Sequence, residues 1–397
     1  MAMKRPYSRL IIFFIPAVLI PIAAFLAING EIRGGYEGIF LLKGESPFSF
    51  RITDDVYHGE QDKVLLSVPL RLHSRAFAIP PSYAAGTTVL SSEWDPDTGR
   101  GCITSNHPNG TKLVSCFGRF IDGNGKAPAG LFLGGNLPFT VKVGTRTVPN
   151  ATGMSFYDGA RWNHIWCSVN EAFLTNEPHP LNLGPAKMKF LGGKVLRNTE
   201  SQVILTSSHE IPLRNTTLLM QRYVFFKAGD IHYVMVNKVI NIGSNEANFS
   251  YVYGDEPWVG NYGSSRGDVG WLQDRIVNEE GAFDTRTNSF AGMFDYGNPV
   301  MNEGTHYTRA ANFIEWLGEP PSVGFFSNKP GYFEERRQPL ASDTRFIGLQ
   351  WGPQLLAPGE SKTYILAIGM AGRDAMSGFP VKPRVDFPFE TYREIVQ

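Results

Sequence analysis

Two carboxylates and an indole follow an apolar pattern in the second half of the chain, at Asp255, Glu256 and Trp258. Aromatic rings stack on the C–H face of sugars, while carboxylates and amides hydrogen-bond to hydroxyl groups. These residue types predict a carbohydrate site at this point of the chain. Further candidates for stacking or hydrogen bonding follow in a glycine-rich stretch: Tyr262, Arg266, Asp268 and Trp271.

His164 is a second candidate, because it lies between the indoles of Trp162 and Trp166. The opposing interpretation is that most of these aromatic residues belong to the core. Residues 263–267 also match G-x-S-x-G, but a nucleophile elbow needs a helix after the serine, and none begins there. Zinc-protease, thiol-redox, P-loop and dinucleotide motifs are missing from the sequence, which therefore predicts no metal and no cofactor.

The element that positions the carboxylates is a series of strands over residues 223–226, 231–242 and 247–253. Turn sequences rich in Gly, Asn and Asp separate the three strands. Apolar side chains occupy both faces of the middle strand, which predicts a strand inside a sheet that is covered on both sides. The last strand ends directly before Asp255.

Composition limits the classes that the chain can belong to. Its 397 residues carry 37 basic and 37 acidic side chains, and a net charge of zero argues against a nucleic-acid partner. There are 42 glycines and 27 prolines, and 13% of residues are aromatic, which favours strands and turns over helices. We therefore expect an all-β fold, a large antiparallel β-sandwich.

The N-terminus predicts a membrane segment. Lys4, Arg5 and Arg9 precede a charge-free run over residues 10–28, which as a helix is about 30 Å long, enough to cross a bilayer. Positive charges before the run place the remainder on the extracytoplasmic side, whether periplasmic, extracellular or lumenal. A single-pass anchor and a cleaved signal peptide both remain open, and both place the folded part outside the cytoplasm.

Cysteine spacing is consistent with an oxidising compartment. Cys102 and Cys116 flank a hairpin signal in which residues 108–110 form the loop, and counting back from it pairs the two cysteines. A disulfide is the predicted outcome, and two unpaired buried thiols are the alternative. Cys167 is left over as a core residue.

Two short motifs resemble the galactose-mutarotase-like superfamily. Residues 233–258 form a strand, a turn and a strand that ends in Gly-x-x-Pro-aromatic. Residues 346–353, followed by Leu356-Ala-Pro-Gly-Glu and a last strand to Gly369, resemble the closing strands of that superfamily. The resemblance covers the second half of the chain and implies a β-supersandwich that binds sugar.

The departures from the motif bear on activity. The resemblance implies a histidine acid and a glutamate base, and the matching positions here are Glu256 and Gln350. An amide does not accept a proton at neutral pH, so Gln350 cannot be that base. The sequence thus predicts a sugar-binding protein without mutarotase activity, and we expect Gln350 to line the site.

The predicted organisation is an anchor or signal over residues 1–30, an N-terminal β region over 31–150, a sandwich over 151–372 and an extended tail over 373–397. The expected function is a membrane-anchored extracytoplasmic protein that binds an oligo- or polysaccharide and no nucleic acid. The alternative is a carbohydrate-active enzyme, an epimerase or lyase, with Glu256 or Asp255 as the titrating group. A purely structural subunit is a third possibility.

Overall fold

The computed structural model describes residues 37–40, 48–51, 89–117, 140–143, 146–149, 153–157, 162–166, 171–176, 182–184, 187–255, 259, 268–295, 311–327, 346–374, 376 and 379–396. Within these ranges no helix has the length and apolar character to cross a bilayer. The charge-free run over residues 10–28 lies outside them, so the anchor stays a prediction.

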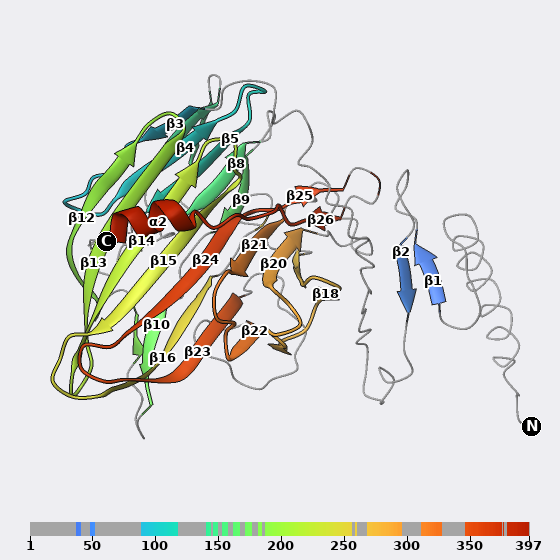
Figure 1. The fold of residues 1–397 in the computed structure, drawn as a ribbon. Helices are drawn as coiled ribbons and strands as arrows, with labels where there is room; N and C mark the ends of the chain where they lie inside the picture. The colour runs from blue at the N-terminus through green and yellow to red at the C-terminus, as the bar shows by residue number, and fades with distance from the viewer. Residues whose placement is uncertain are drawn as a thin grey trace, which may run out of the picture.

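A nine-stranded antiparallel sheet is the largest sheet of the described residues (Figure 1). Its strands in spatial order are β12 (Lys189–Asn198), β13 (Gln202–Pro212), β14 (Thr217–Lys227), β15 (His232–Asn241), β24 (Ser361–Met370), β21 (Asn312–Trp316), β20 (Phe290–Asp295), β17 (Asp268–Trp271) and β18 (Ile276–Val277).

Two further sheets are antiparallel as well. The six-stranded sheet has the order β11 (Asn182–Leu183), β10 (Ala172–Thr175), β16 (Ala247–Asp255), β23 (Phe346–Leu356), β22 (Val323–Ser327) and β19 (Gly281–Phe283). The five-stranded sheet has the order β3 (Val89–Ser92), β4 (Gly101–Asn106), β5 (Lys112–Phe117), β8 (Met154–Tyr157) and β9 (Trp162–Trp166).

Three two-stranded ribbons complete the strands of the described residues. They pair β1 (Glu37–Phe40) with β2 (Phe48–Arg51), β6 (Thr140–Val143) with β7 (Arg146–Pro149), and β25 (Gly372–Arg373) with β26 (Pro380–Val381). The predicted all-β antiparallel sandwich is therefore confirmed.

Strand β15 has the surroundings that its apolar pattern predicts. It pairs with β14 on one side and β24 on the other. Tyr233 and Met235 belong to the core between the sheets, while Val234 and Val236 belong to a second cluster on the opposite face. Alternation along the strand thus buries apolar side chains on both faces, as predicted.

One face of the nine-stranded sheet is covered by the two other sheets together. From the five-stranded sheet, Phe117 packs against Phe226 and Tyr233, with ring centroids 5.9 Å apart in both pairs. From the six-stranded sheet, Tyr251 packs on Tyr364 at 4.5 Å. A single apolar core runs through these contacts.

Described strands on the two sides of residue 150 belong to the same sheet. Strands β8 and β9 lie after that position, yet β8 pairs with β5 through Leu113 and Phe156. The five-stranded sheet also shares its core with the larger sheet, where Trp94 packs over Gly193 and a Cβ at position 193 would clash with its ring. The described N-terminal strands are thus part of the sandwich.

The C-terminal segment combines a stretch without regular structure and a short helix. Residues 382–388 have no regular structure, but the chain ends in a helix, α2 (Phe389–Val396). Pro388 immediately precedes the helix, where proline is tolerated, while Glu390 and Arg393 complement the helix dipole. Figure 1 shows α2 lying across the outer face of the nine-stranded sheet.

The hairpin of β4 and β5 has the predicted register. His107 and Thr111 are joined by a backbone hydrogen bond of 2.9 Å, and Cys102 lies opposite Cys116. In the structure the two sulfur atoms are joined as a disulfide. Asp95 stabilises the preceding turn by accepting hydrogen bonds from the backbone N–H of Asp97 and the hydroxyl of Thr98.

Candidate functional site

The two strands that carry the resembling motifs are neighbours in the six-stranded sheet. Strand β16 ends at Asp255 and β23 contains Gln350, and the two strands pair antiparallel. Val252 lies opposite Gln350, and Gly254 lies opposite Gly348. Segments far apart in the sequence therefore meet along one ladder of hydrogen bonds.

Gln350 lies on the face of this sheet that points away from the core. Its neighbour Trp351 is buried in the core, together with Tyr251. Val252 belongs instead to a small separate cluster with Ala172 and Leu174 on the other face. Residues directly opposite in a sheet share a face, so Gln350 projects on the side of Val252 and is partly exposed.

The structure describes the backbone of three more predicted site residues. Asp255 ends β16, Asp268 begins β17 in the nine-stranded sheet, and His164 lies within β9 of the five-stranded sheet. These strands belong to three different sheets, so the ladder that joins Asp255 to Gln350 does not include His164 or Asp268. Glu256, Trp258, Tyr262 and Arg266 lie outside the described residues.

Trp271 is a core residue, contrary to its predicted role as a stacking surface. Its side chain is 1% exposed, and the indole N–H donates to the backbone oxygen of Asn312 at 2.9 Å. The ring packs against Phe290 at a centroid distance of 4.7 Å. A ring enclosed in this way offers no face to a sugar, so the structure corrects this prediction.

A buried polar network, which the sequence analysis missed, joins the nine-stranded and six-stranded sheets. Arg222 of β14 forms an ion pair with Glu171 and donates to Asn237 Oδ1 at 2.8 Å. Asn237 donates to the hydroxyl of Tyr251 at 2.8 Å, and that hydroxyl donates to Glu171 at 2.6 Å. All four residues are buried. The available signal was an arginine in the middle of an apolar strand, which requires a buried partner.

The function of this network is structural. A charge pair without contact to water has no access to a substrate. Hydrogen bonds join all four side chains, while Glu171 Oε2 is buried without a hydrogen-bond partner among the described residues. Nearby, Ser207 Oγ lies 2.8 Å from His209 Nε2, and both side chains are buried as well. Burial lowers the pKa of His209 well below its ordinary value, with a smaller contribution from Arg222.

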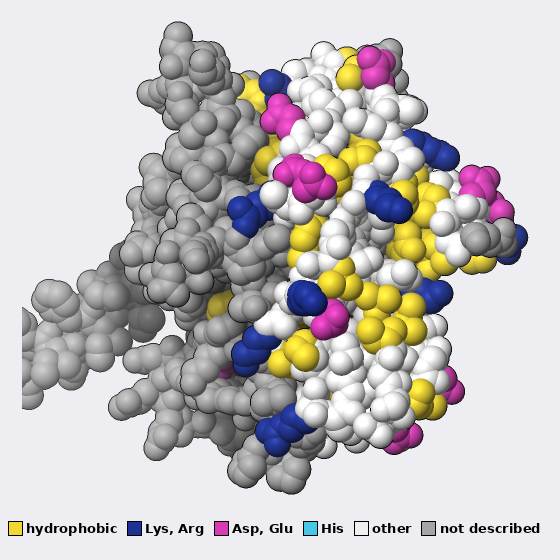
Figure 2. Space-filling view, turned by 90° about the vertical axis from the view of Figure 1, so that its left-hand side faces the viewer, with side chains coloured by type: hydrophobic (Ala, Val, Ile, Leu, Met, Phe, Trp, Pro, Cys, Tyr) yellow, Lys and Arg dark blue, Asp and Glu magenta, His cyan; other side chains and the backbone are white. Residues whose placement is uncertain are grey.

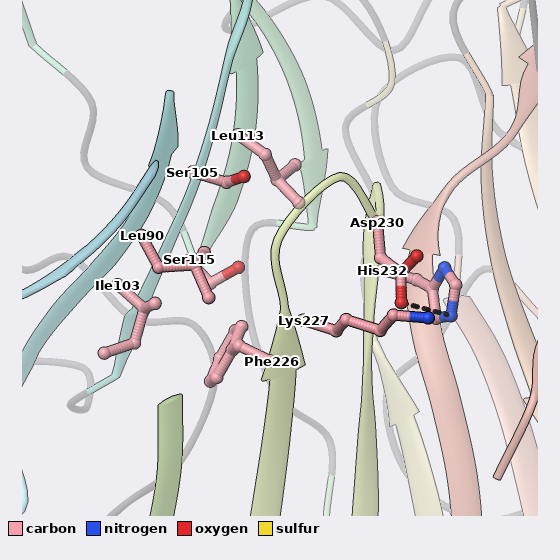
Figure 3. A pocket seen from close by; sticks show the side chains of 9 residues that line it. All are labelled: Leu90, Ile103, Ser105, Leu113, Ser115, Phe226, Lys227, Asp230 and His232. Atoms are coloured by element: carbon pink, nitrogen blue, oxygen red, sulfur yellow. Dashed lines mark ion pairs between the residues drawn. The ribbon is translucent and has the colours of Figure 1, made fainter. Parts of the chain in front are cut away.

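A second titratable cluster lies at the turn between β14 and β15 (Figure 3). His232 Nε2 is 3.8 Å from Asp230 Oδ2, and Lys227 reaches toward the pair. Burial raises the pKa of Asp230 to about 6, against a smaller opposing effect of Lys227. Burial, reinforced by Lys382 and Lys227, lowers the pKa of His232 to about 4.

The cavity beside this cluster is too small for a sugar. It is lined by Ser105 and Ser115 from the five-stranded sheet, whose hydroxyls point toward the turn in Figure 3, and by Phe226. Its free space is that of about one water molecule. Among the described residues no group of three or more His, Cys, Asp or Glu side chains is placed to hold a metal ion.

Comparisons with known proteins find distant structural similarity. No protein-family model matches the chain, and no curated protein matches its sequence. Solved structures with a similar arrangement include galactose mutarotase-like proteins, the class that the sequence motifs resemble.

Individual matches are distant. The galactose mutarotase-like protein of Clostridium acetobutylicum is 9% identical, with 72% of this chain and 99% of that chain covered and a TM-score of 0.37. The galactose mutarotase-like protein of Lactobacillus casei is 8% identical, with 71% of this chain and 99% of that chain covered and a TM-score of 0.32. An α-galactosidase from Geobacillus stearothermophilus is 7% identical, with 72% and 41% covered and a TM-score of 0.37. Similarity at these identities and TM-scores does not indicate an activity for this chain.

Proposed function

We propose that this protein binds carbohydrate on the outer face of the six-stranded sheet, where β16 and β23 run side by side, and that it lacks mutarotase chemistry. One observation carries the proposal: Val252 lies opposite Gln350. This register places the two motifs that resemble sugar-binding strands side by side. Asp255 ends the same strand, where it lies opposite Ile347.

The residue type at position 350 favours binding over catalysis. A glutamine amide donates and accepts hydrogen bonds, which suits sugar hydroxyls, but it does not take up a proton at neutral pH. Its partial exposure leaves it accessible to a ligand. Ring opening of an aldose needs a base, and the matching position does not supply one.

The proposal also includes a location outside the cytoplasm, held at a membrane. Its support is the charge-free run over residues 10–28 behind Lys4, Arg5 and Arg9. A disulfide between Cys102 and Cys116 is consistent with an oxidising compartment. A cleaved signal peptide would place the folded part in the same compartment without the anchor.

Binding is tested with the full-length protein in detergent. Calorimetric titration with mono- and oligosaccharides is expected to detect binding, and Gln350→Ala to weaken it roughly tenfold, the value of about one hydrogen bond to a hydroxyl. Gln354→Ala is the matched control, because Gln354 is a partly exposed glutamine on the same strand. Equal affinity in both variants would place the ligand elsewhere.

Catalysis is tested by polarimetry on freshly dissolved aldoses. We expect no acceleration of mutarotation by the wild-type protein. Turnover by the wild-type protein that disappears in Glu256→Gln would overturn the proposal in favour of a carbohydrate-active enzyme. Gln350→Glu, compared with Gln354→Glu, then shows whether restoring a carboxylate at this position is sufficient for proton transfer.

A further inference from the structure

Strand β12 is the edge strand of the nine-stranded sheet, and it is unusually exposed. In the described part of the chain, β13 is its hydrogen-bonded neighbour and no strand pairs along its other side. Three of its aliphatic side chains are exposed: Leu191 by 48%, Val195 by 36% and Leu196 by 39%. Aliphatic groups at an open sheet edge favour contact with an apolar or amphipathic partner.

Leu191 and Leu196 lie at two irregularities in the pairing of β12 with β13. The register with β13 shifts between Phe190 and Gly192 and again between Val195 and Arg197. Leu191 and Leu196 are thus the additional residues of two bulges, and neither has a partner position on β13. Bulges interrupt the hydrogen-bonding ladder and, together with lysine, protect an edge against a further strand. The exposed leucines therefore fit a partner other than another β-strand.

The charge of β12 is uniformly positive. Lys189, Lys194 and Arg197 are its charged residues, and the strand contains no acid. Across the ladder, Lys194 lies opposite Thr206 and Arg197 opposite Ile204, while Lys189 is 4.0 Å from Glu210. At least two of the three cations therefore have no carboxylate directly opposite them. An anionic surface is the complementary partner.

We propose that β12 docks on the surface of an anionic lipid bilayer, with Leu191, Val195 and Leu196 in contact with the acyl boundary and the three cations at the headgroups. Aliphatic side chains interleaved with cations are typical of elements that bind at such an interface. Figure 2, which faces the side where β12 lies in Figure 1, shows hydrophobic groups on this face with Lys and Arg, and also Asp and Glu, between them.

An anionic glycan fits β12 less well. Sugar-binding surfaces use aromatic rings for stacking and carboxylates or amides for hydroxyl groups. The exposed apolar residues of β12 are aliphatic, and its single aromatic residue, Phe190, packs on His209 at a centroid distance of 5.5 Å. Lipid docking is also independent of the proposed sugar site on β16 and β23, and of whether the N-terminal segment is retained.

The test places an environment-sensitive fluorophore on the strand. Full-length protein carrying Cys167→Ser and Val195→Cys is labelled with a nitrobenzoxadiazole probe and combined with mixed phosphatidylcholine and phosphatidylglycerol vesicles. Emission is expected to rise and to be quenched by doxyl-labelled lipid, and both effects to weaken at high salt. In the double variant Lys194→Gln, Arg197→Gln the ratio of docked to undocked protein should fall about 30-fold, because two cations that attract the anionic surface are removed.

The control probe is at Leu355→Cys, which replaces a leucine that is 59% exposed on β23. We expect this probe to report water with every lipid. Identical signals from positions 195 and 355 would overturn the proposal, as would a probe at 195 that ignores phosphatidylglycerol. A response at 195 to soluble polyanionic polysaccharide, or to protein concentration without lipid, would overturn it in favour of a glycan or a second copy of the chain.

Discussion

His232 is buried at the start of β15 and is held in its neutral form. Its side chain is 5% exposed, and burial together with Lys382 and Lys227 lowers its pKa to about 4. Asp386 of the C-terminal segment opposes this shift, and the ring of Phe313 lies 6.0 Å away. The unfolded chain binds a proton at His232 near pH 6.5, whereas the folded chain does not.

This difference gives the fold an acid-sensitive residue. A depressed pKa contributes stability above about pH 6.5 that is lost as the pH falls toward 4. We expect His232→Leu to remove a pH-dependent loss of up to about 3 kcal/mol in the free energy of unfolding. Urea titrations between pH 7 and 4 in an Asp230→Asn background measure it. If the free energy of unfolding changed with pH equally in the Asp230→Asn protein with and without His232→Leu, His232 would not be the acid-sensitive residue.

Asp230 acts with the opposite sign. Burial raises its pKa to about 6, so its contribution to stability is present below about pH 4 and is lost as the pH rises through 6. Asp230→Asn should stabilise the fold at pH 7.5 by about 1 to 2 kcal/mol, a value reduced for the partial exposure of the side chain. The gain should vanish near pH 4. Asp274→Asn, at an exposed turn, is the control.

At the scale of elements, the buried network of Arg222, Glu171, Asn237 and Tyr251 ties the two main sheets together. Glu171→Gln leaves a guanidinium without its counter-charge in the core and should cost about 3 to 5 kcal/mol. Replacing Arg222 and Glu171 together by Met should cost less than the sum of the single changes.

A surface pair provides the comparison for that double-mutant cycle. Lys362 and Glu319 form an ion pair in which the carboxylate is 55% exposed. Glu319→Gln should change the free energy of unfolding by less than about 1 kcal/mol. Chemical denaturation measures the free energy of unfolding of the Glu171→Gln and Glu319→Gln variants. Equal losses in the two variants would argue against a core role for the Glu171 charge.

The C-terminal segment covers the outer apolar face of the nine-stranded sheet. Lys382 pairs with Glu315 of β21 at 2.8 Å, and Tyr392 of α2 packs edge-on against Tyr223 and Phe225 at 5.8 and 6.3 Å. Apolar residues of this segment join the cluster on that face. A helix of this length depends on such contacts, because short helices are marginal in water.

Two aromatic residues of α2 allow a matched test of this cover. Tyr392→Ala should destabilise the fold by about 2 kcal/mol, since it removes an aromatic contact from the sheet. Phe389→Ala should have little effect on stability, because Phe389 is 51% exposed. Thermal unfolding measures both variants. A larger loss for Phe389→Ala than for Tyr392→Ala would contradict the described packing.

For the whole molecule, the compartment and the disulfide are linked. A loop closed over a sequence separation of 14 contributes about 3 kcal/mol of stability in the oxidised protein. When the full chain is expressed in a bacterium, we expect Cys102 and Cys116 to resist thiol labelling until a reductant is added. Deleting residues 1–30 should leave both thiols reactive in the reducing cytoplasm. Protection that survives the deletion would contradict export by this segment.

The sequence by itself determined the local features: strands at residues 223–253, the hairpin register that pairs Cys102 with Cys116, and the amide at position 350. Side-chain alternation and turn residues act over a few positions, so they can be recognised without a partner. The tertiary structure decided the pairing of β16 with β23, the burial of Trp271 and the inclusion of β8 in the five-stranded sheet. Such features depend on which distant segment covers a residue, and the residues next to it in the sequence do not determine that segment.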